Sequence, residues 1–445
     1  MKKLLGLLLL TPIIFLSCQK ETNKPQGKQS LARINNPGNG FGNISPAMVL
    51  TWNEAATQAI ANMTPIVGAP LPPMPESRIY AMVNVAIHDA LNNIVPKYQT
   101  YALSNARDKD ADPDAAVAQA AHDVIVALLP PQQGFADNLL NTSLAGIKDG
   151  DAKTGGITLG KAAASAILAN RINDGADNAQ IPYLQGIEPG QYRSTPPFDG
   201  PPFNGFVAVP GWGNIKPFCL SSSSQFRPVP PYSLNTPEYT ADYNDVKSLG
   251  SSASIARTAD QTEIAIFWLE NAPLSFNRIA RTMIGKYNLD AWRSARLLAL
   301  LQLAEADANI ACFEAKYYYN YWRPITAIRL GDSDGNSNTT GDVAWDVLAP
   351  PTPPVPDYPS NHSTNGGAGA AILKDFFGKD NISYSQTSSS LPNTTRNLSS
   401  FSQAAMENAL SRVYVGYHFR NACLKGVEQG YKVGDYVFAN YLKVK

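Results

Sequence analysis

The sequence predicts a mainly α-helical fold. Apolar residues recur at spacings of three and four in several windows of the chain, which places them along one side of a helix. No region shows sustained alternation of apolar and polar residues, the pattern of a half-buried strand. The first helical windows are joined by short connections, as in bundles of packed helices. We therefore expect residues 46–445 to form one all-α domain of packed helix bundles with a long Pro-rich loop wrapped over it.

The first part of this domain has a regular helical pattern. Ser77 follows Pro75 and precedes an apolar stripe, so it is the predicted N-cap of the first helix. His88 and His122 lie in the first two helices, each directly before an aspartate, and we interpret both as structural, hydrogen-bonded histidines. The predicted helices span residues 77–94, 114–129, 135–147 and 156–173.

Residues 178–237 carry prolines, glycines and aromatic residues at high density and without a period. Two interpretations stay open for this stretch. It is either a long wrap over the surface or the aromatic rim of a pocket, since long loops of compact domains are often functional. Helical patterns resume after it, at residues 259–271, 276–287 and 289–319.

The start of the chain is typical of an exported protein. Two lysines precede a short apolar run, residues 4–16, which cannot span a bilayer and is followed by Ser17 and Cys18. This arrangement resembles a bacterial lipoprotein signal, which is cleaved before a cysteine that is then lipidated. We expect a signal peptide at residues 1–17, a polar tether at 18–45 and an extracytoplasmic protein anchored to a membrane through Cys18. A secreted or periplasmic protein without the lipid is the alternative.

Charge and cysteine content give no sign of a nucleic-acid-binding or cysteine-based metal-binding function. The chain has 36 basic and 36 acidic residues, so no electrostatic footprint for nucleic acid is visible. The cysteines beyond Cys18 are odd in number, and their spacings do not suggest a metal site, so we interpret Cys219, Cys312 and Cys423 as buried free thiols. No oligomeric state is predicted from the sequence.

Three clusters of cationic, hydroxyl and imidazole side chains follow one another in the last third of the chain. A tetrahedral oxyanion requires this inventory: fixed positive charge, directed N–H and O–H donors, and a histidine that attacks or coordinates the central atom. Each cluster alone is a weak signal, but three in this order indicate an oxyanion site. The clusters are Lys316 with Arg323–Pro324, then Pro359–Ser360–Asn361–His362, then Ser411–Arg412 with His418.

The first cluster lies where a long helix is expected to end. Lys316 and Arg323 are seven residues apart, about 700° around a continuing helix and thus on nearly the same face. Pro324 disfavours helical geometry at Arg323, so the helix should end near that residue. An isolated pair of this kind would be a solvated basic pair, and the two clusters that follow favour an oxyanion site instead.

The second cluster lies at the N-terminus of a predicted helix. Residues 363–377 have small side chains through nearly all of their first half, which permits close packing against a neighbour. Ser360, Asn361 and His362 therefore lie where unsatisfied N–H groups and the helix dipole favour an anion. An ordinary N-cap would explain Ser360 but not His362.

The third cluster lies on a helix predicted from about residue 402 to 417. His418 is seven residues after Ser411 and therefore on nearly the same face of that helix. Arg412 is long enough to reach the same centre.

These three motifs, in this order, resemble the superfamily of vanadium-dependent haloperoxidases and type 2 phosphatidic acid phosphatases, whose signature is K-x6-RP, then PSGH, then SR-x5-H. Asn361 stands where the family has glycine, and because asparagine tolerates left-handed geometry the backbone there can be kept. Ala422 stands where an aspartate usually follows the last histidine. Segments outside the motifs, at residues 210–218, 257–262 and 322–329, look like the soluble bacterial haloperoxidase branch.

The resemblance implies a role for each site residue. His418 would bond vanadium, and its other ring nitrogen needs a partner that Ala422 cannot supply. His362 would be the acid–base group. The activity implied is oxidation of halide, with iodide or bromide favoured, by hydrogen peroxide to hypohalous acid, with vanadate as the cofactor. The residues implied to bind vanadate oxygens are Lys316, Arg323, Ser360, Asn361 through its N–H group, and Arg412.

Two other functions stay open. A soluble acid phosphatase would use His418 to attack phosphorus, giving a phosphohistidine intermediate, and His362 to protonate the leaving group of a small phosphate ester. A lipoprotein that binds an anion or a partner without catalysis is compatible with the departures at Asn361 and Ala422. Activity assays with and without vanadate distinguish all three.

Overall fold

The computed structural model describes residues 44–64 and 71–445. The predicted signal peptide, Cys18 and nearly all of the predicted tether lie outside the described residues. Helices dominate the part that is described, so the prediction of a mainly α-helical fold is confirmed. None of the described helices is both long enough and apolar enough to cross a membrane.

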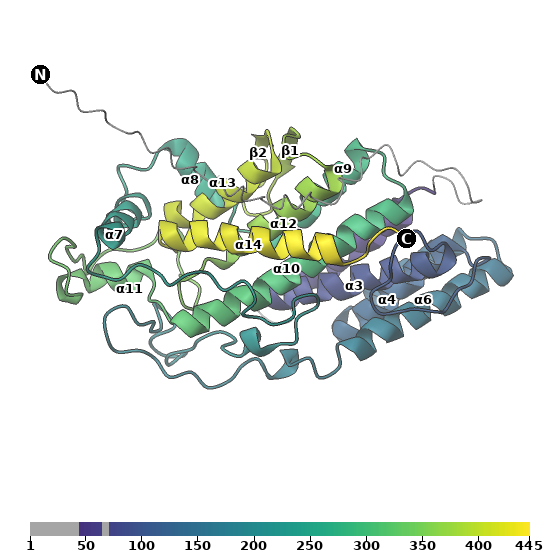
Figure 1. Ribbon diagram of the computed structural model, residues 1–445, viewed down its shortest axis with the longest axis horizontal. Helices are drawn as coiled ribbons and strands as arrows, with labels where there is room; N and C mark the ends of the chain where they lie inside the picture. The colour runs from purple at the N-terminus through teal and green to yellow at the C-terminus, as the bar shows by residue number, and fades with distance from the viewer. Residues whose placement is uncertain (1–43, 65–70) are drawn as a thin grey trace, which may run out of the picture. The chain divides into compact units, whose positions relative to one another are not determined.

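A first group of helices packs around α4 (Figure 1). These helices are α1 (Ala47–Ala61), α3 (Pro73–Ile94), α4 (Pro113–Leu128), α5 (Gln133–Ala145) and α6 (Asp151–Asn170). α4 contacts each of the others, and Figure 1 shows α3, α4 and α6 side by side. The N-cap of α4 is Asp112, whose side chain accepts the N–H of Ala115. The predicted cap at Ser77 is wrong, because α3 begins at Pro73 and the Ser77 hydroxyl donates to the Met74 carbonyl inside the helix.

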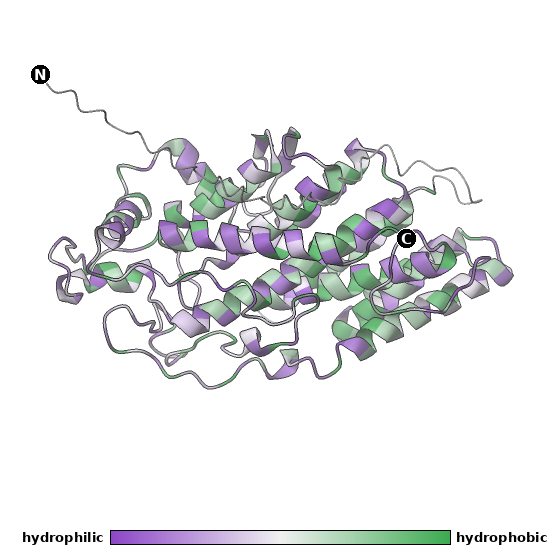
Figure 2. Cartoon of the chain, viewed as in Figure 1, coloured by the Kyte–Doolittle hydropathy of each residue, from purple (hydrophilic) through white to green (hydrophobic). Residues whose placement is uncertain are grey.

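A second group carries the three clusters. It comprises α10 (Ala291–Tyr319), α12 (Asn361–Phe377), α13 (Phe401–Tyr414) and α14 (Arg420–Asn440). α10 lies between the two groups, since it contacts α3 on one side and α12 and α14 on the other. Hydrophilic and hydrophobic residues alternate along α14 in Figure 2, as expected for a helix with one buried and one exposed face.

α12 and α14 approach each other at backbone distance. A Cβ atom at Gly430 of α14 would lie 2.0 Å from the carbonyl oxygen of Thr364, and one at Gly367 of α12 would lie 2.4 Å from that of Val427. No side chain fits in such a space, so glycine is required at both positions. The predicted close packing of the small half of α12 is confirmed, and it holds the second cluster against α14.

The Pro-rich stretch packs over the segments that carry the first two clusters. It is irregular apart from single turns, η3 (Ala176–Asn178) and η4 (Trp212–Asn214). The N–H of Trp322 donates to the Gly190 carbonyl at 3.0 Å, and the Tyr358 hydroxyl donates to the Val229 carbonyl at 2.6 Å. The stretch is therefore a wrap that also fixes the backbone next to Arg323 and Ser360.

Two features depart from the expected helical pattern. A hairpin of β1 (Tyr384–Thr387) and β2 (Thr395–Leu398) pairs antiparallel, with Tyr384 opposite Leu398. Each strand has four residues, which is too short for a clear alternation in the sequence. α13 ends at Tyr414 rather than near residue 417, so His418 lies beyond the helix.

The remaining helices connect these groups, and the three cysteines among the described residues are buried free thiols, as predicted. The connecting elements are α7 (Pro237–Leu249), α8 (Ala259–Phe267), α9 (Ala272–Lys286), α11 (Pro324–Arg329), η2 (Pro130–Gln132) and η5 (Gly331–Ser333).

Candidate active site

The first cluster spans the junction between α10 and α11. Lys316 lies in the last turn of α10, which ends at Tyr319 because Asn320 adopts a left-handed conformation. The helix thus ends where the apolar pattern predicted, four residues before Arg323. Arg323 is the N-cap residue of α11, and its extended backbone is the geometry that Pro324 favours.

Lys316 is a fully buried cation without a carboxylate partner among the described residues. Its Nζ atom donates to the carbonyl oxygens of Pro356 at 2.7 Å and Asp357 at 3.0 Å. Burial lowers the pKa of Lys316 to about 7, and the Arg323 guanidinium acts in the same direction. An anion within reach would favour the charged form again.

Arg323 is also buried and lies against the third cluster. Its Nε donates to the Val355 carbonyl at 2.7 Å, and its Nη1 donates to the Tyr417 carbonyl at 2.9 Å. The same Nη1 lies 2.9 Å from Nε2 of His418. Two residues that are 95 positions apart in the chain are therefore in direct contact.

The second cluster is anchored at the N-terminus of α12. Ser360 is the N-cap residue, and its N–H donates to the Ala422 carbonyl on α14 at 2.9 Å. The Ser360 hydroxyl is buried and has no hydrogen-bond partner among the described residues. A buried hydroxyl without a partner costs free energy unless a ligand or water satisfies it, so this atom indicates a binding position.

Asn361, which replaces the family glycine, is the first residue of α12. Its backbone is helical, so the tolerance of asparagine for left-handed geometry is not needed. Its side-chain oxygen accepts a hydrogen bond from Asn365 one turn later, at 3.4 Å. Its N–H is one of the free donors at the start of a helix.

His362 is held by a backbone carbonyl. Its Nε2 lies 3.0 Å from the carbonyl oxygen of Glu270, which can only accept, so Nε2 carries a proton and Nδ1 is the unprotonated nitrogen of the neutral ring. Burial, reinforced by the nearby Arg412, lowers the pKa of His362 well below its usual value. The His362 carbonyl accepts from Asn408 of α13 at 2.8 Å, which joins the second cluster to the third.

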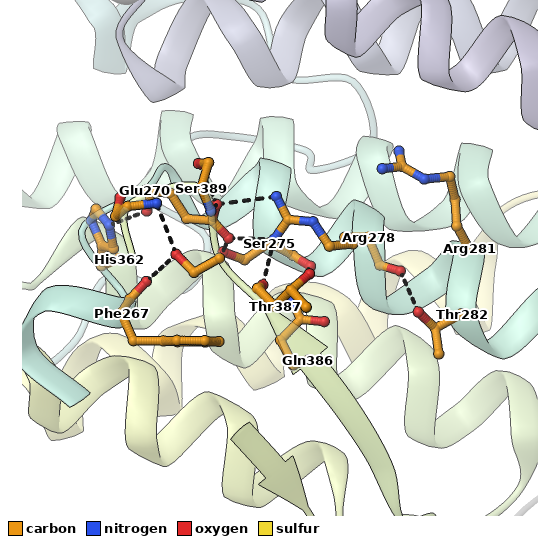
Figure 3. Close-up of polar contacts among 12 residues, drawn as sticks. Phe267, Glu270, Ser275, Arg278, Arg281, Thr282, His362, Gln386, Thr387 and Ser389 are labelled. Atoms are coloured by element: carbon orange, nitrogen blue, oxygen red, sulfur yellow. Dashed lines mark hydrogen bonds and ion pairs between the residues drawn. The ribbon is translucent and has the colours of Figure 1, made fainter. Parts of the chain in front are cut away.

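Glu270, in the bend between α8 and α9, fixes the carbonyl that holds His362 (Figure 3). Its carboxylate accepts from the Ser275 hydroxyl at 2.6 Å, from Nη1 of Arg278 at 2.6 Å and from the N–H of Ser389 at 2.8 Å. Sequence reasoning missed this residue. The nearest sequence signal was the haloperoxidase-like stretch at residues 257–262. It contains Thr258, the capping-box residue of α8, and Glu270 follows the end of that helix.

The third cluster begins on α13 and ends in the loop that follows it. Arg412 is buried, and its Nη2 donates to the Trp268 carbonyl at 2.6 Å. Burial lowers the pKa of Arg412 to about 10. Gly416 has φ of +89°, and a Cβ there would lie 2.6 Å from the carbonyl oxygen of Gly250. This turn, rather than a continuing helix, directs His418 into the site.

His418 lies between a guanidinium and a carboxylate. Its Nε2 faces Nη1 of Arg323, and its Nδ1 lies 2.8 Å from Oδ1 of Asp357. Burial and Arg323 lower the pKa of His418 well below its usual value. Burial raises the pKa of Asp357 to about 8, against the opposing influence of Arg323 and Lys316.

The structure brings the predicted site residues together around His418. The charges of Arg323, Lys316, Arg412 and His362 all act on its ring, and Ser360 and Asn361 directly precede His362. Within residues 44–64 and 71–445, no group of three or more histidine, cysteine or acidic side chains could hold a metal cation. Buried cations, an unpartnered hydroxyl and free helix N–H groups instead fit an oxyanion such as vanadate or phosphate.

Residues 296–444 match the family model of the VCPO second helical-bundle domain. Vanadium chloroperoxidase from Curvularia inaequalis is 25% identical over 489 residues, covering 84% of this chain and 78% of that protein.

Two solved structures share the fold. The first bacterial vanadium-dependent iodoperoxidase is 26% identical, with a TM-score of 0.76 and coverage of 92% of this chain and 98% of that chain. The holo form of a bacterial vanadium-dependent chloroperoxidase is 18% identical, with a TM-score of 0.65, 83% of this chain and 92% of that chain covered. The resemblance drawn from the three motifs is confirmed: in sequence and in fold, this chain is similar to vanadium-dependent haloperoxidases.

Proposed function

We propose that the chain is a vanadate-dependent haloperoxidase that oxidises a halide with hydrogen peroxide. The observation that carries this proposal is the buried cation set around His418. Lys316, Arg323 and Arg412 are at most 2% exposed, and Asp357 is the one carboxylate in an ion pair with them among the described residues. Burying such charges is costly unless an anion compensates them.

Vanadate would be held mainly by charge and hydrogen bonds. The three cations would donate to its oxygens, with the Ser360 hydroxyl and the Asn361 N–H as neutral donors. His418 would supply the one bond to vanadium, through Nε2. When bound, vanadate activates hydrogen peroxide toward attack by a halide. The positive charge of Lys316, Arg323 and Arg412 would stabilise the negative charge that develops on peroxide oxygen.

His362 would move protons at the same site. Its Nδ1 lacks a proton in the neutral ring, while Nε2 stays bonded to the Glu270 carbonyl. Nδ1 is therefore the atom that takes a proton when peroxide binds and returns it when the oxidised halide leaves. The low pKa of His362 keeps it in the neutral, accepting form near pH 7.

Iodide or bromide is the proposed halide. Chloride is the hardest of the three to oxidise, and the bacterial structure that is 26% identical is an iodoperoxidase. Peroxide-driven halogenation of a dye with iodide, bromide and chloride in parallel tests this order. Turnover with chloride comparable to that with iodide would contradict it.

A phosphatase is the second candidate, because the same donors fit phosphate and Nε2 of His418 could attack phosphorus. Vanadate should have opposite effects on the two activities: it activates a haloperoxidase and inhibits a phosphatase. We expect orthovanadate to activate halide oxidation by the purified protein, starting from about residue 24. A phosphatase would instead hydrolyse a phosphate monoester and be inhibited by vanadate, which mimics the five-coordinate transition state. Activity in neither assay would favour a non-catalytic anion-binding protein.

We also propose that the protein is anchored to an extracytoplasmic membrane face through Cys18, on the basis of its short apolar run and the Ser17–Cys18 pair. Cys18→Ser should release the protein from the membrane or leave the precursor uncleaved. Membrane retention of a correctly processed Cys18→Ser product would argue against the anchor.

A further inference from the structure

Asp357 is a fully buried carboxylate that contacts three residues of the candidate site. Its Oδ1 lies 2.8 Å from Nδ1 of His418 and 3.9 Å from Nη1 of Arg323. Its backbone carbonyl accepts a hydrogen bond from Lys316 at 3.0 Å. Neither carboxylate oxygen accepts a hydrogen bond of good geometry among the described residues, so the 2.8 Å approach of His418 is the closest polar side-chain contact of Oδ1.

The two neighbours of the His418 ring determine where its proton lies. A guanidinium has donors and no acceptor, and Nη1 of Arg323 lies closer to Nε2 of His418, at 2.9 Å, than to Nδ1, at 3.3 Å, so Nε2 is the ring nitrogen that accepts. The proton of the neutral ring is therefore on Nδ1, where it faces Oδ1 of Asp357. A protonated Asp357 that donated to Nδ1 would place the ring proton on Nε2, directly against the N–H of Arg323.

Asp357 lies at a different position in the chain from the aspartate of the family motif, which follows the last histidine by four residues. The chain has Ala422 four residues after His418, and Ala422 and Asp357 line the same small cavity, of about 10 Å³, which has room for about one water molecule. Asp242 lines it too, but its carboxylate accepts from the N–H of Asn421 at 3.1 Å and has no contact with His418.

We propose that Asp357 is the positioning residue of His418, replacing the acidic residue that Ala422 lacks. It accepts the Nδ1 proton, fixes the ring orientation and leaves Nε2 unprotonated, so that its lone pair accepts from Arg323 until an oxyanion takes that place. The use of that lone pair to bond vanadium rests on the proposed function. The position of the proton does not, because it follows from contacts within the chain.

Nitrogen NMR of the protein labelled with ¹⁵N-histidine tests the proton position without vanadate or substrate. The chain has 4 histidines, so the His418 signals can be assigned by their loss in His418→Gln. We expect a protonated Nδ1 and an unprotonated Nε2 in the parent protein. A proton on Nε2 in the parent would overturn the proposal.

Variants then test whether Asp357 is the cause. Asp357→Ala should mix the two tautomers and weaken vanadate binding by about 10–100-fold, the usual effect of removing a partner behind a metal-bonding histidine. Asp242→Asn is the matched control, because it removes a carboxylate from the same cavity. It should leave the His418 tautomer and the vanadate affinity unchanged. Circular dichroism confirms that each variant is folded.

An exchange of positions completes the test. Asp357→Ala combined with Ala422→Asp returns a carboxylate to the cavity from the position used by the motif, and it should restore the Nδ1 proton and most of the affinity. An unchanged tautomer in Asp357→Ala, an equal effect of Asp242→Asn, or no recovery in the exchanged variant would overturn the proposal. If the tautomer behaves as expected but no variant or parent oxidises halide, the proposed function fails and the role of Asp357 stands.

Discussion

The first group of helices and the candidate site both contain histidines held by hydrogen bonds, but they surround them with opposite charge. His122 of α4 lies between the carboxylates of Asp123 at 2.7 Å and Asp137 at 2.8 Å. Burial of its ring lowers the pKa, and the two hydrogen bonds outweigh this and raise it. Burial and nearby cations lower the pKa of both His362 and His418.

The sign of the surrounding charge therefore distinguishes His122 from the two histidines of the candidate site. His418 has an acidic neighbour as His122 does, yet Arg323, Lys316 and Arg412 dominate its environment. In the first group, His122 pairs with the adjacent Asp123 and with Asp137 of α5, while the cations of the site come from three distant segments. Only the arrangement at the candidate site, with cations from three segments, leaves positive charge to bind an anionic ligand.

The largest effect is expected from His418→Ala. Removing Nε2 takes away the one bond to vanadium, so halide oxidation should fall below detection. Vanadate binding should weaken but persist, because Lys316, Arg323 and Arg412 remain. Activity and vanadate binding by equilibrium dialysis are measured together. Halogenation equal to that of the parent would show that His418 has no such role.

His362→Ala should have the next largest effect. Loss of the proton carrier is expected to lower turnover by about 10²–10⁴-fold while vanadate affinity changes much less. His122→Gln is the control histidine and should leave turnover unchanged. Steady-state kinetics at saturating vanadate measure the turnover of both variants. If His362→Ala lost vanadate affinity but kept turnover, His362 would be a binding residue and not the proton carrier.

Arg412→Ala should weaken vanadate binding by about 1.5–3 kcal/mol, the contribution of one charged hydrogen bond. Turnover at saturating vanadate should change less than affinity. Dialysis against a vanadate series measures the shift. Arg396, which is paired with Glu407 at 2.6 Å outside the site, provides a control arginine whose loss should not alter affinity.

The smallest expected effect is a pH-dependent loss of thermal stability when His122, in the first group of helices, is replaced. Because the folded pKa of His122 is raised above its usual value of about 6.5, its contribution to stability is present below that pH. It is lost as pH rises through the folded pKa. His122→Gln should therefore lower the melting temperature more at pH 5.5 than at pH 9. A constant difference across this range would contradict the pairing with Asp123 and Asp137.

The sequence predicted the helical fold and the members of the site because both depend on local pattern. Apolar spacing located α10, the small residues after residue 362 located α12, and the motif order selected Lys316, Arg323 and His418 as candidate site residues. Asp357 and Glu270 were not found, since their roles depend on tertiary contacts with His418 and His362.

Boundaries set by single residues were also missed. The end of α13 was placed near residue 417, but the helix ends at Tyr414 and Gly416 turns the chain, at a point where apolar spacing still permits a helix. The hairpin at β1 and β2 is stabilised by pairing between strands too short to show a period.

Titration of metal-free protein with orthovanadate, in the presence of hydrogen peroxide and iodide or bromide, tests the central claim most directly. Halide oxidation should rise from near zero to a plateau at one vanadate per chain, and inorganic phosphate should slow this rise by competing for Lys316, Arg323, Ser360 and Arg412. Excess vanadate should restore the plateau. No peroxide-dependent halogenation at any vanadate concentration, together with phosphate-ester hydrolysis that vanadate inhibits, would contradict the account and identify a phosphatase.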